Sequence, residues 1–194
     1  MLFLLKRTAP TALLALAALA ALGLGLRRLI GDGVPPLRFT PYLILVGVGV
    51  CGAALVSDGL IHGGLGLAFG RPYLERYREL AATFRGQTVA AMLAGAAMAG
   101  VGEELVFRGL SREWAVLLPL AVAFGLLHHV RRRLWPFTLW SIWEGVVFAA
   151  ALWWTGELAV TMTAHFLHDI LGFLIFRVEN RRPAAPPRSP PGRG

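Results

Sequence analysis

The chain has 194 residues, of which 56% are hydrophobic and only 15% charged, and its formal net charge is +8. A soluble domain carries about 25% charged residues, so this composition leaves too few polar side chains to cover a surface in water. It argues against a soluble globular enzyme, a disordered chain and a nucleic-acid-binding protein. It predicts an integral membrane protein with room for about five to seven spans of about 20 residues each.

The pattern of apolar stretches predicts an all-α fold, a polytopic transmembrane helix bundle of about six spans. The stretches cover residues 8–26, 41–57, 87–107, 115–130, 136–155 and 157–176. Because Lys6 and Arg7 precede the first stretch, residues 1–26 could also be a signal peptide. Arg27 and Arg28 follow this stretch directly, which favours a retained span.

The basic residues gather on one side of the membrane if both termini lie in the cytoplasm. Most of the 19 basic residues then face inward, namely Lys6, Arg7 and the arginines of segments 71–85, 131–133 and 177–193. The first outer loop, with Arg27, Arg28 and Arg38, is the exception. Membrane topology therefore explains the positive charge better than nucleic-acid binding does. The short Ala-, Leu-, Gly- and Arg-rich chain suggests a bacterial inner (cytoplasmic) membrane.

Residues 71–86 differ from the spans. Tyr73, Tyr77, Leu80 and Phe84 recur at helical spacing among charged residues, which predicts an amphipathic helix lying in the cytoplasmic interface. A solvated connecting helix is the alternative.

The chain is predicted to have three parts. Residues 1–86 form the N-terminal spans with the interfacial helix, and residues 87–177 form a second group of spans. Residues 178–194 form a basic, Pro-rich tail that cannot bury a core and is predicted to be disordered.

Six ionisable residues lie within or at the ends of apolar stretches, where charge is costly and function is the default hypothesis. They are Glu103, Glu104, Arg108, His128, His165 and Asp169. One of two adjacent carboxylates can act as a general base for water, while Arg108 pairs with the other one helical turn away. The two histidines can share the proton of the base, bind a metal or donate to an oxyanion. Small residues before Glu103 allow close helix packing around such a site.

Each of these residues also has a structural interpretation. Glu104 with Arg108 can be a structural ion pair, His128 an interfacial side chain, and His165 with Asp169 a packing pair. Their coincidence on three separate segments favours a functional site.

Other ionisable residues are predicted to have no role in the site. His129 and His168 lie on the wrong helix face. Glu144 and Glu157 resemble residues at span ends or in the interface, and Glu144, between Trp143 and Gly145, is the more suspicious of the two. Asp58 and His62 are four residues apart, but the sequence suggests no third partner for them.

The sequence resembles a known family at three motifs in order. Glu103-Glu104-Leu-Val-Phe-Arg108 matches the EExxxR motif of the CPBP intramembrane proteases, the CAAX-protease and bacteriocin-processing family. Phe124-Gly-Leu-Leu-His128 matches its FxxxH motif, and His165-Phe-Leu-His-Asp169 its HxxxN/D motif. The resemblance covers about residues 88–176 and includes type II CAAX prenyl endopeptidases among the relatives.

This resemblance implies an intramembrane endopeptidase. Glu103 and His128 would activate water, Glu104 and Arg108 would orient and support them, and His165 would stabilise the oxyanion. Asp169 stands where the family often has asparagine. An ionised aspartate cannot donate a hydrogen bond, so Asp169 either orients His165 or is protonated.

The need for a metal stays open. A glutamate-type mechanism is favoured, and if zinc is bound its ligands would be Glu103, His128 and His165. No other cofactor is expected.

The expected partners are the lipid bilayer and a membrane-associated protein or peptide substrate. A sorting or maturation role on C-terminally anchored proteins, or the processing of leader peptides, would suit a compact bacterial chain. The alternatives are a non-enzymatic protein that binds haem between His128 and His165, a small transporter, and a pseudoprotease that binds peptides without cleaving them.

Overall fold

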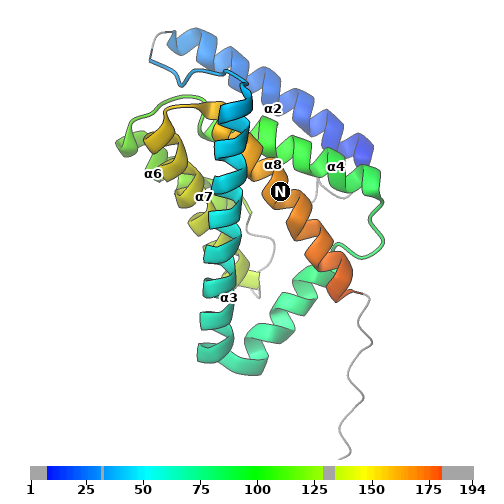
Figure 1. Ribbon diagram of the computed structural model, residues 1–194. Helices are drawn as coiled ribbons and strands as arrows, with labels where there is room; N and C mark the ends of the chain where they lie inside the picture. The colour runs from blue at the N-terminus through cyan, green and yellow to red at the C-terminus, as the bar shows by residue number, and fades with distance from the viewer. Residues whose placement is uncertain (1–7, 32, 129–133, 181–194) are drawn as a thin grey trace, which may run out of the picture.

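The computed structural model describes residues 8–31, 33–128 and 134–180, and in these ranges it is helical with no strand. The elements are α2 (Ala9–Ile30), α3 (Pro41–Ala82), α4 (Val89–Ala97), the π-helix η1 (Met98–Glu103), α5 (Glu104–Phe107), α6 (Trp114–Leu127), α7 (Trp135–Thr155) and α8 (Leu158–Glu179). This confirms the all-α prediction (Figure 1). The predicted disorder of the tail concerns residues that lie almost entirely outside the described ranges.

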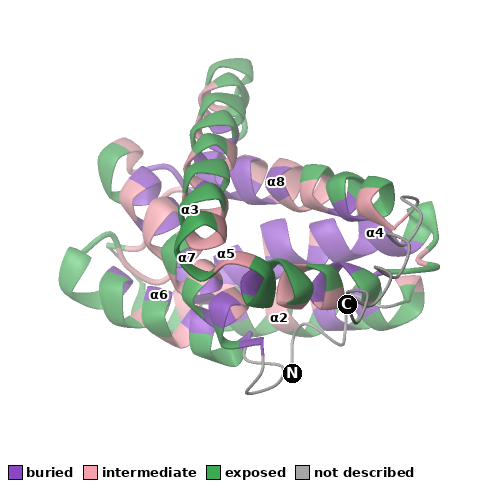
Figure 2. Ribbon diagram, turned by 90° about the horizontal axis from the view of Figure 1, so that it is seen from below, coloured by how far each residue is buried: buried purple, intermediate pink, exposed green. Residues whose placement is uncertain are grey.

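Five helical stretches of the described chain are long and apolar enough to cross a membrane. They are α2, α3, the continuous stretch Val89–Phe107, α7 and α8. The sixth apolar helix, α6, has 14 residues and is therefore about 21 Å long, less than the roughly 30 Å of a hydrocarbon core. Exposed residues lie on the periphery and buried ones between the helices (Figure 2). The chain is an integral membrane protein.

The predicted amphipathic helix is the second half of α3. The helix bends at Gly70, whose φ of 56° and ψ of −138° fall outside helical geometry and suit glycine. Beyond the bend the chain turns back toward the end of α8 (Figure 1). There Leu80, at the end of this half, and Phe84, just beyond it, pack against Phe173 of α8. The helix ends at Ala82, so the predicted end at residue 86 is four residues too late.

Close packing of small residues brings the central helices together. In Figure 1, α8 crosses the molecule beside α4, and α2 lies along the other side of α4. A Cβ atom added at Gly100 of η1 would lie 2.6–2.8 Å from the backbone and Cβ of Phe166 in α8. Ala96 and Ala99 are completely buried in the same region. These contacts fix η1, which ends at Glu103 and leads directly into Glu104 of α5, against α8, which carries His165.

Polar contacts join the end of α2 and the loop between α2 and α3 to other parts of the fold. Arg27 donates hydrogen bonds to the backbone oxygens of Gly109 and Pro35. Arg38 pairs with Glu157, the residue that precedes α8, and this contact raises the pKa of the Arg38 guanidinium. The predicted position of Glu157 at a span end agrees with the structure. Arg27 in α2 and Arg38 in the following loop therefore have structural roles that do not depend on membrane topology.

Candidate functional site

Glu103 and Glu104 lie where a π-helical segment returns to an α-helix. The π-helix η1 ends at Glu103, and α5 begins at Glu104. Both side chains are completely buried. π-Helical turns within α-helices occur frequently at functional sites. This irregular backbone therefore directs two adjacent carboxylates into the protein interior.

Glu104 is the centre of a buried network that joins two of the three motifs. Its Oε1 accepts hydrogen bonds from Arg108 Nη1 at 2.9 Å and from His165 Nδ1 at 2.8 Å. Arg108 is 1% exposed, donates from Nη2 to the backbone oxygen of Gly145, and stacks its guanidinium over Phe124 at 4.5 Å. The ion pair expected from the sequence is present, and it also orients His165.

Glu103 faces His128 rather than the arginine. Neither carboxylate oxygen of Glu103 has a hydrogen-bond partner among the described residues. His128 Nδ1 donates to the backbone oxygen of Phe124 at 2.8 Å, which directs its Nε2 toward Glu103 Oε2 at 3.9 Å. A buried carboxylate without a partner is costly. A water molecule between Glu103 and His128 would give this carboxylate a hydrogen-bond partner.

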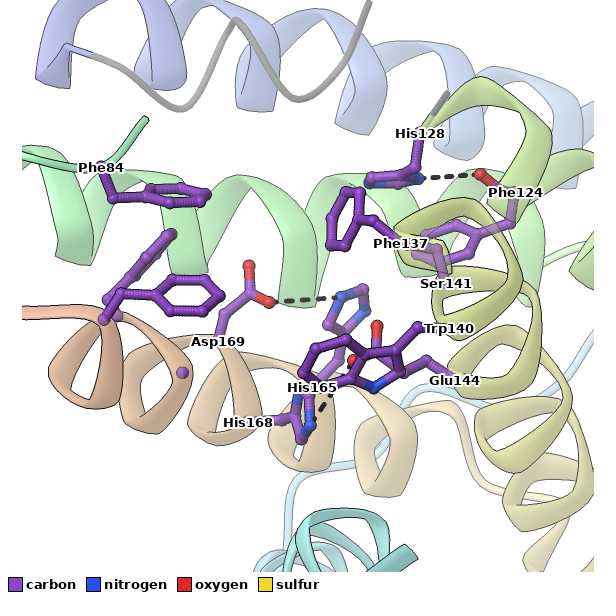
Figure 3. Close-up of a pocket in the computed structure, with 13 residues that line it drawn as sticks. Phe84, Phe124, His128, Phe137, Trp140, Ser141, Glu144, His165, His168 and Asp169 are labelled. Carbon is purple, nitrogen blue, oxygen red and sulfur yellow. Dashed lines mark hydrogen bonds and ion pairs between the residues drawn. The ribbon is translucent and has the colours of Figure 1, made fainter. Parts of the chain in front are cut away.

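The two histidines open onto a cavity of about 80 Å³. His128, His165 and Asp169 line it, while Glu103 and Glu104 are enclosed beside it. Asp169 Oδ1 lies 3.9 Å from His165 Nε2 (Figure 3). The rest of the wall is largely aromatic, formed by Phe84, Phe124, Phe137, Trp140, Phe173 and Phe176. The structure therefore brings all six predicted site residues to one place, with an apolar groove beside them.

The donor atoms of Glu103, His128 and His165 do not converge as metal ligands usually do. Among the described residues, the group whose donor atoms all lie within 4.8 Å of one another is a different one, Asp58, Glu144 and His168. His165 directs Nδ1 to Glu104 and Nε2 toward Asp169. Glu103 and His128 nevertheless offer an unpaired carboxylate and a ring nitrogen that face each other, and these atoms fit zinc or water.

No pattern in the sequence brought these three residues together. His168 does not lie on an unused face, because its Nε2 donates to Asp58 Oδ2 at 2.6 Å. Asp58 has this histidine, rather than His62, as its partner. Glu144 is not at a span end, because it lies in the middle of α7 and its Oε1 is 3.7 Å from His168 Nε2. The only sequence feature that could have drawn attention to these residues is that each is ionisable and lies within an apolar stretch.

Comparison with known protein families gives a match at the segment that holds the site. Residues 85–171 match the family model described as type II CAAX prenyl endopeptidase Rce1-like. The comparisons with curated proteins and with solved structures give no match. The matched segment contains all three motifs and so confirms the resemblance identified from them. It indicates a membrane-embedded protease.

Proposed function

We propose that this protein is an intramembrane endopeptidase that hydrolyses a peptide bond of a membrane-associated or C-terminally anchored protein. The observation that carries the proposal is the pairing of Glu103 with His128. The carboxylate is fully buried and without a hydrogen-bond partner among the described residues, and it lies 3.9 Å from a ring nitrogen at the wall of a cavity. Such a pair is suited to hold and deprotonate one water molecule.

In the proposed reaction, Glu103 and His128 take a proton from water as its oxygen attacks the carbonyl carbon of the substrate. The same pair then returns a proton to the leaving nitrogen as the C–N bond breaks. This sequence is a glutamate-type mechanism and needs no metal. If zinc is bound here, Glu103 and His128 would hold it, and it would supply Lewis-acid activation of the water.

His165 is proposed to donate from Nε2 to the oxyanion. Its Nδ1–H already donates to Glu104, so Nε2 must also carry a proton for this role. Glu104 at Nδ1 and Asp169, whose Oδ1 lies 3.9 Å from Nε2, hold the imidazole ring between them. The proposed role of Asp169 is therefore to support His165, rather than to donate to the oxyanion itself.

The aromatic wall of the cavity supports an apolar substrate segment. Phe137 lies beside His128, while Phe84 lies on the far side of Asp169 from it (Figure 3). Phe173 also lines the cavity. We propose that the groove holds a hydrophobic stretch of the substrate beside the scissile bond, and that the protein acts in protein sorting or maturation. A bacterial inner membrane, with both termini cytoplasmic, remains part of this proposal.

Haem binding between the two histidines fits the site less well. Pockets for ligands of that size have volumes of about 300–1,000 Å³, whereas this cavity has about 80 Å³. In addition, His165 already bonds Glu104. The proposed protease therefore accounts for the polar groups better than a haem protein does.

The test uses the full chain in detergent or vesicles with hydrophobic peptides and anchored tails as substrates. Glu103→Gln and His128→Ala should each lower kcat by a factor of about 10² to 10⁴, the usual contribution of general acid–base groups. Glu75→Gln is the matched control, because Glu75 is an exposed glutamate on the second half of α3. Its cleavage rate should equal that of the wild type.

Membrane insertion and thermal stability are measured in parallel, so that lost cleavage is not confused with lost folding. Cleavage at the wild-type rate by folded Glu103→Gln protein would contradict the proposed mechanism.

A further inference from the structure

A second cluster of ionisable groups lies outside the proposed catalytic set. Asp58 comes from α3, Glu144 from α7 and His168 from α8, and their donor atoms all lie within 4.8 Å of one another. His168 Nε2 is central, 2.6 Å from Asp58 Oδ2 and 3.7 Å from Glu144 Oε1. Three helices thus converge on one point through side chains of metal-binding types.

Acidic groups outnumber basic groups in this cluster. Two carboxylates face one histidine, and within the described ranges neither carboxylate pairs with a lysine or arginine. Glu144 makes no hydrogen bond to the described residues, although its side chain is only 16% exposed. Cys51, Ala54 and Phe148 form an apolar cluster where α3, α7 and α8 meet. Acidic groups within apolar helices are costly, and a bound cation would compensate them.

The cluster is preorganised and accessible. Trp140 Nε1 donates to Asp58 Oδ1 at 2.8 Å, which fixes the orientation of the carboxylate as outer contacts do in metal sites. A second cavity of about 220 Å³ reaches Asp58 and His168, and the first cavity reaches Glu144 and His168. A cation therefore has space to enter from either side.

We propose that Asp58, Glu144 and His168 bind one divalent metal ion, with Zn²⁺ as the best fit, separately from the proposed catalytic residues. Two carboxylate oxygens and one imidazole nitrogen are a ligand set that Zn²⁺ accepts in tetrahedral geometry, with water as the fourth ligand. A basic side chain of a substrate fits less well, because the imidazole is a poor partner for it. The ion joins α3, α7 and α8 beside the groove.

The experiment measures Zn²⁺ content by mass spectrometry and melting temperature in purified full-length protein. The protein is stripped with a chelator, reloaded with Zn²⁺ and dialysed. Wild-type protein and Glu103→Gln should each retain one Zn²⁺ and melt at a higher temperature with the ion than without it. Asp58→Asn/Glu144→Gln should retain none and show no increase. The Asn side chain keeps an oxygen that can accept from Trp140.

Three results would overturn the proposal. They are an absence of Zn²⁺ in reloaded wild-type protein, retention in the double variant, and loss from Glu103→Gln but not from the double variant. The last result would assign the ion to the proposed catalytic residues. If the double variant does not fold, each single variant is measured, and an affinity loss of less than about tenfold in both would reject the site.

Discussion

Arg108 offers the most direct test of the buried network, because it is expected to serve folding and function at once. Its guanidinium lies 2.9 Å from Glu104, and both side chains are at most 1% exposed. Two unit charges at that separation interact by about 6 kcal/mol at an effective dielectric constant of 20. Removal of one partner from a buried pair costs about 3–5 kcal/mol, because the other charge stays uncompensated.

The perturbation is Arg108→Met, which keeps much of the volume and removes the charge. A loss of 3–5 kcal/mol corresponds to a decrease in melting temperature of about 6–20 °C in a chain of this size. Arg108→Met/Glu104→Gln should recover at least half of that decrease, since no uncompensated charge remains. Its cleavage should stay low, because His165 has lost its anionic partner.

The assay combines thermal unfolding in detergent with cleavage measurements. Arg78→Met is the matched control, because Arg78 is exposed on the second half of α3, and it should melt within about 2 °C of the wild type. The reasoning would be refuted by an Arg108→Met protein as stable as the control. It would equally be refuted by a double variant less stable than Arg108→Met itself.

Three further predictions address the cavity and its packing. Asp169→Asn should cleave at a rate within about tenfold of the wild type, because asparagine still contacts His165. Asp169→Ala should cleave more slowly than Asp169→Asn. Equal cleavage rates in the two variants would exclude a supporting role for Asp169. Gly100→Ala should lower the free energy of unfolding by about 1–3 kcal/mol, because its Cβ would collide with the Phe166 backbone. Gly49→Ala should not lower it, because the Cβ has open space there. Chemical denaturation measures the free energy of unfolding of both variants. Gly172→Leu should lower kcat/KM for hydrophobic substrates without loss of stability, because Gly172 lines the cavity and has open space at its Cβ; unchanged kcat/KM would place the substrate elsewhere.

The sequence alone determined the class of protein and the candidate residues. Apolar stretches long enough to span a membrane predict helices, because backbone polar groups in lipid must bond within the helix. The i to i+4 spacing of Glu104 and Arg108 predicts their pairing, since one helical turn places the two side chains together. Charge is scarce in this chain, so each ionisable residue within an apolar stretch is conspicuous.

Only the tertiary structure decided which of these residues share an environment. Glu104 bonds His165 across 61 residues, and Asp58 bonds His168 across 110, so no local spacing relates the members of either pair. Helix periodicity predicts which residues share a face of one helix, but it does not predict which other helix packs against that face. His168 was therefore judged non-functional from its own helix, although α3 and α7 supply its carboxylates. Close packing at small residues such as Gly100 determines which helices contact each other. It therefore also determines that Glu103 lies outside the hydrogen-bond network of Glu104.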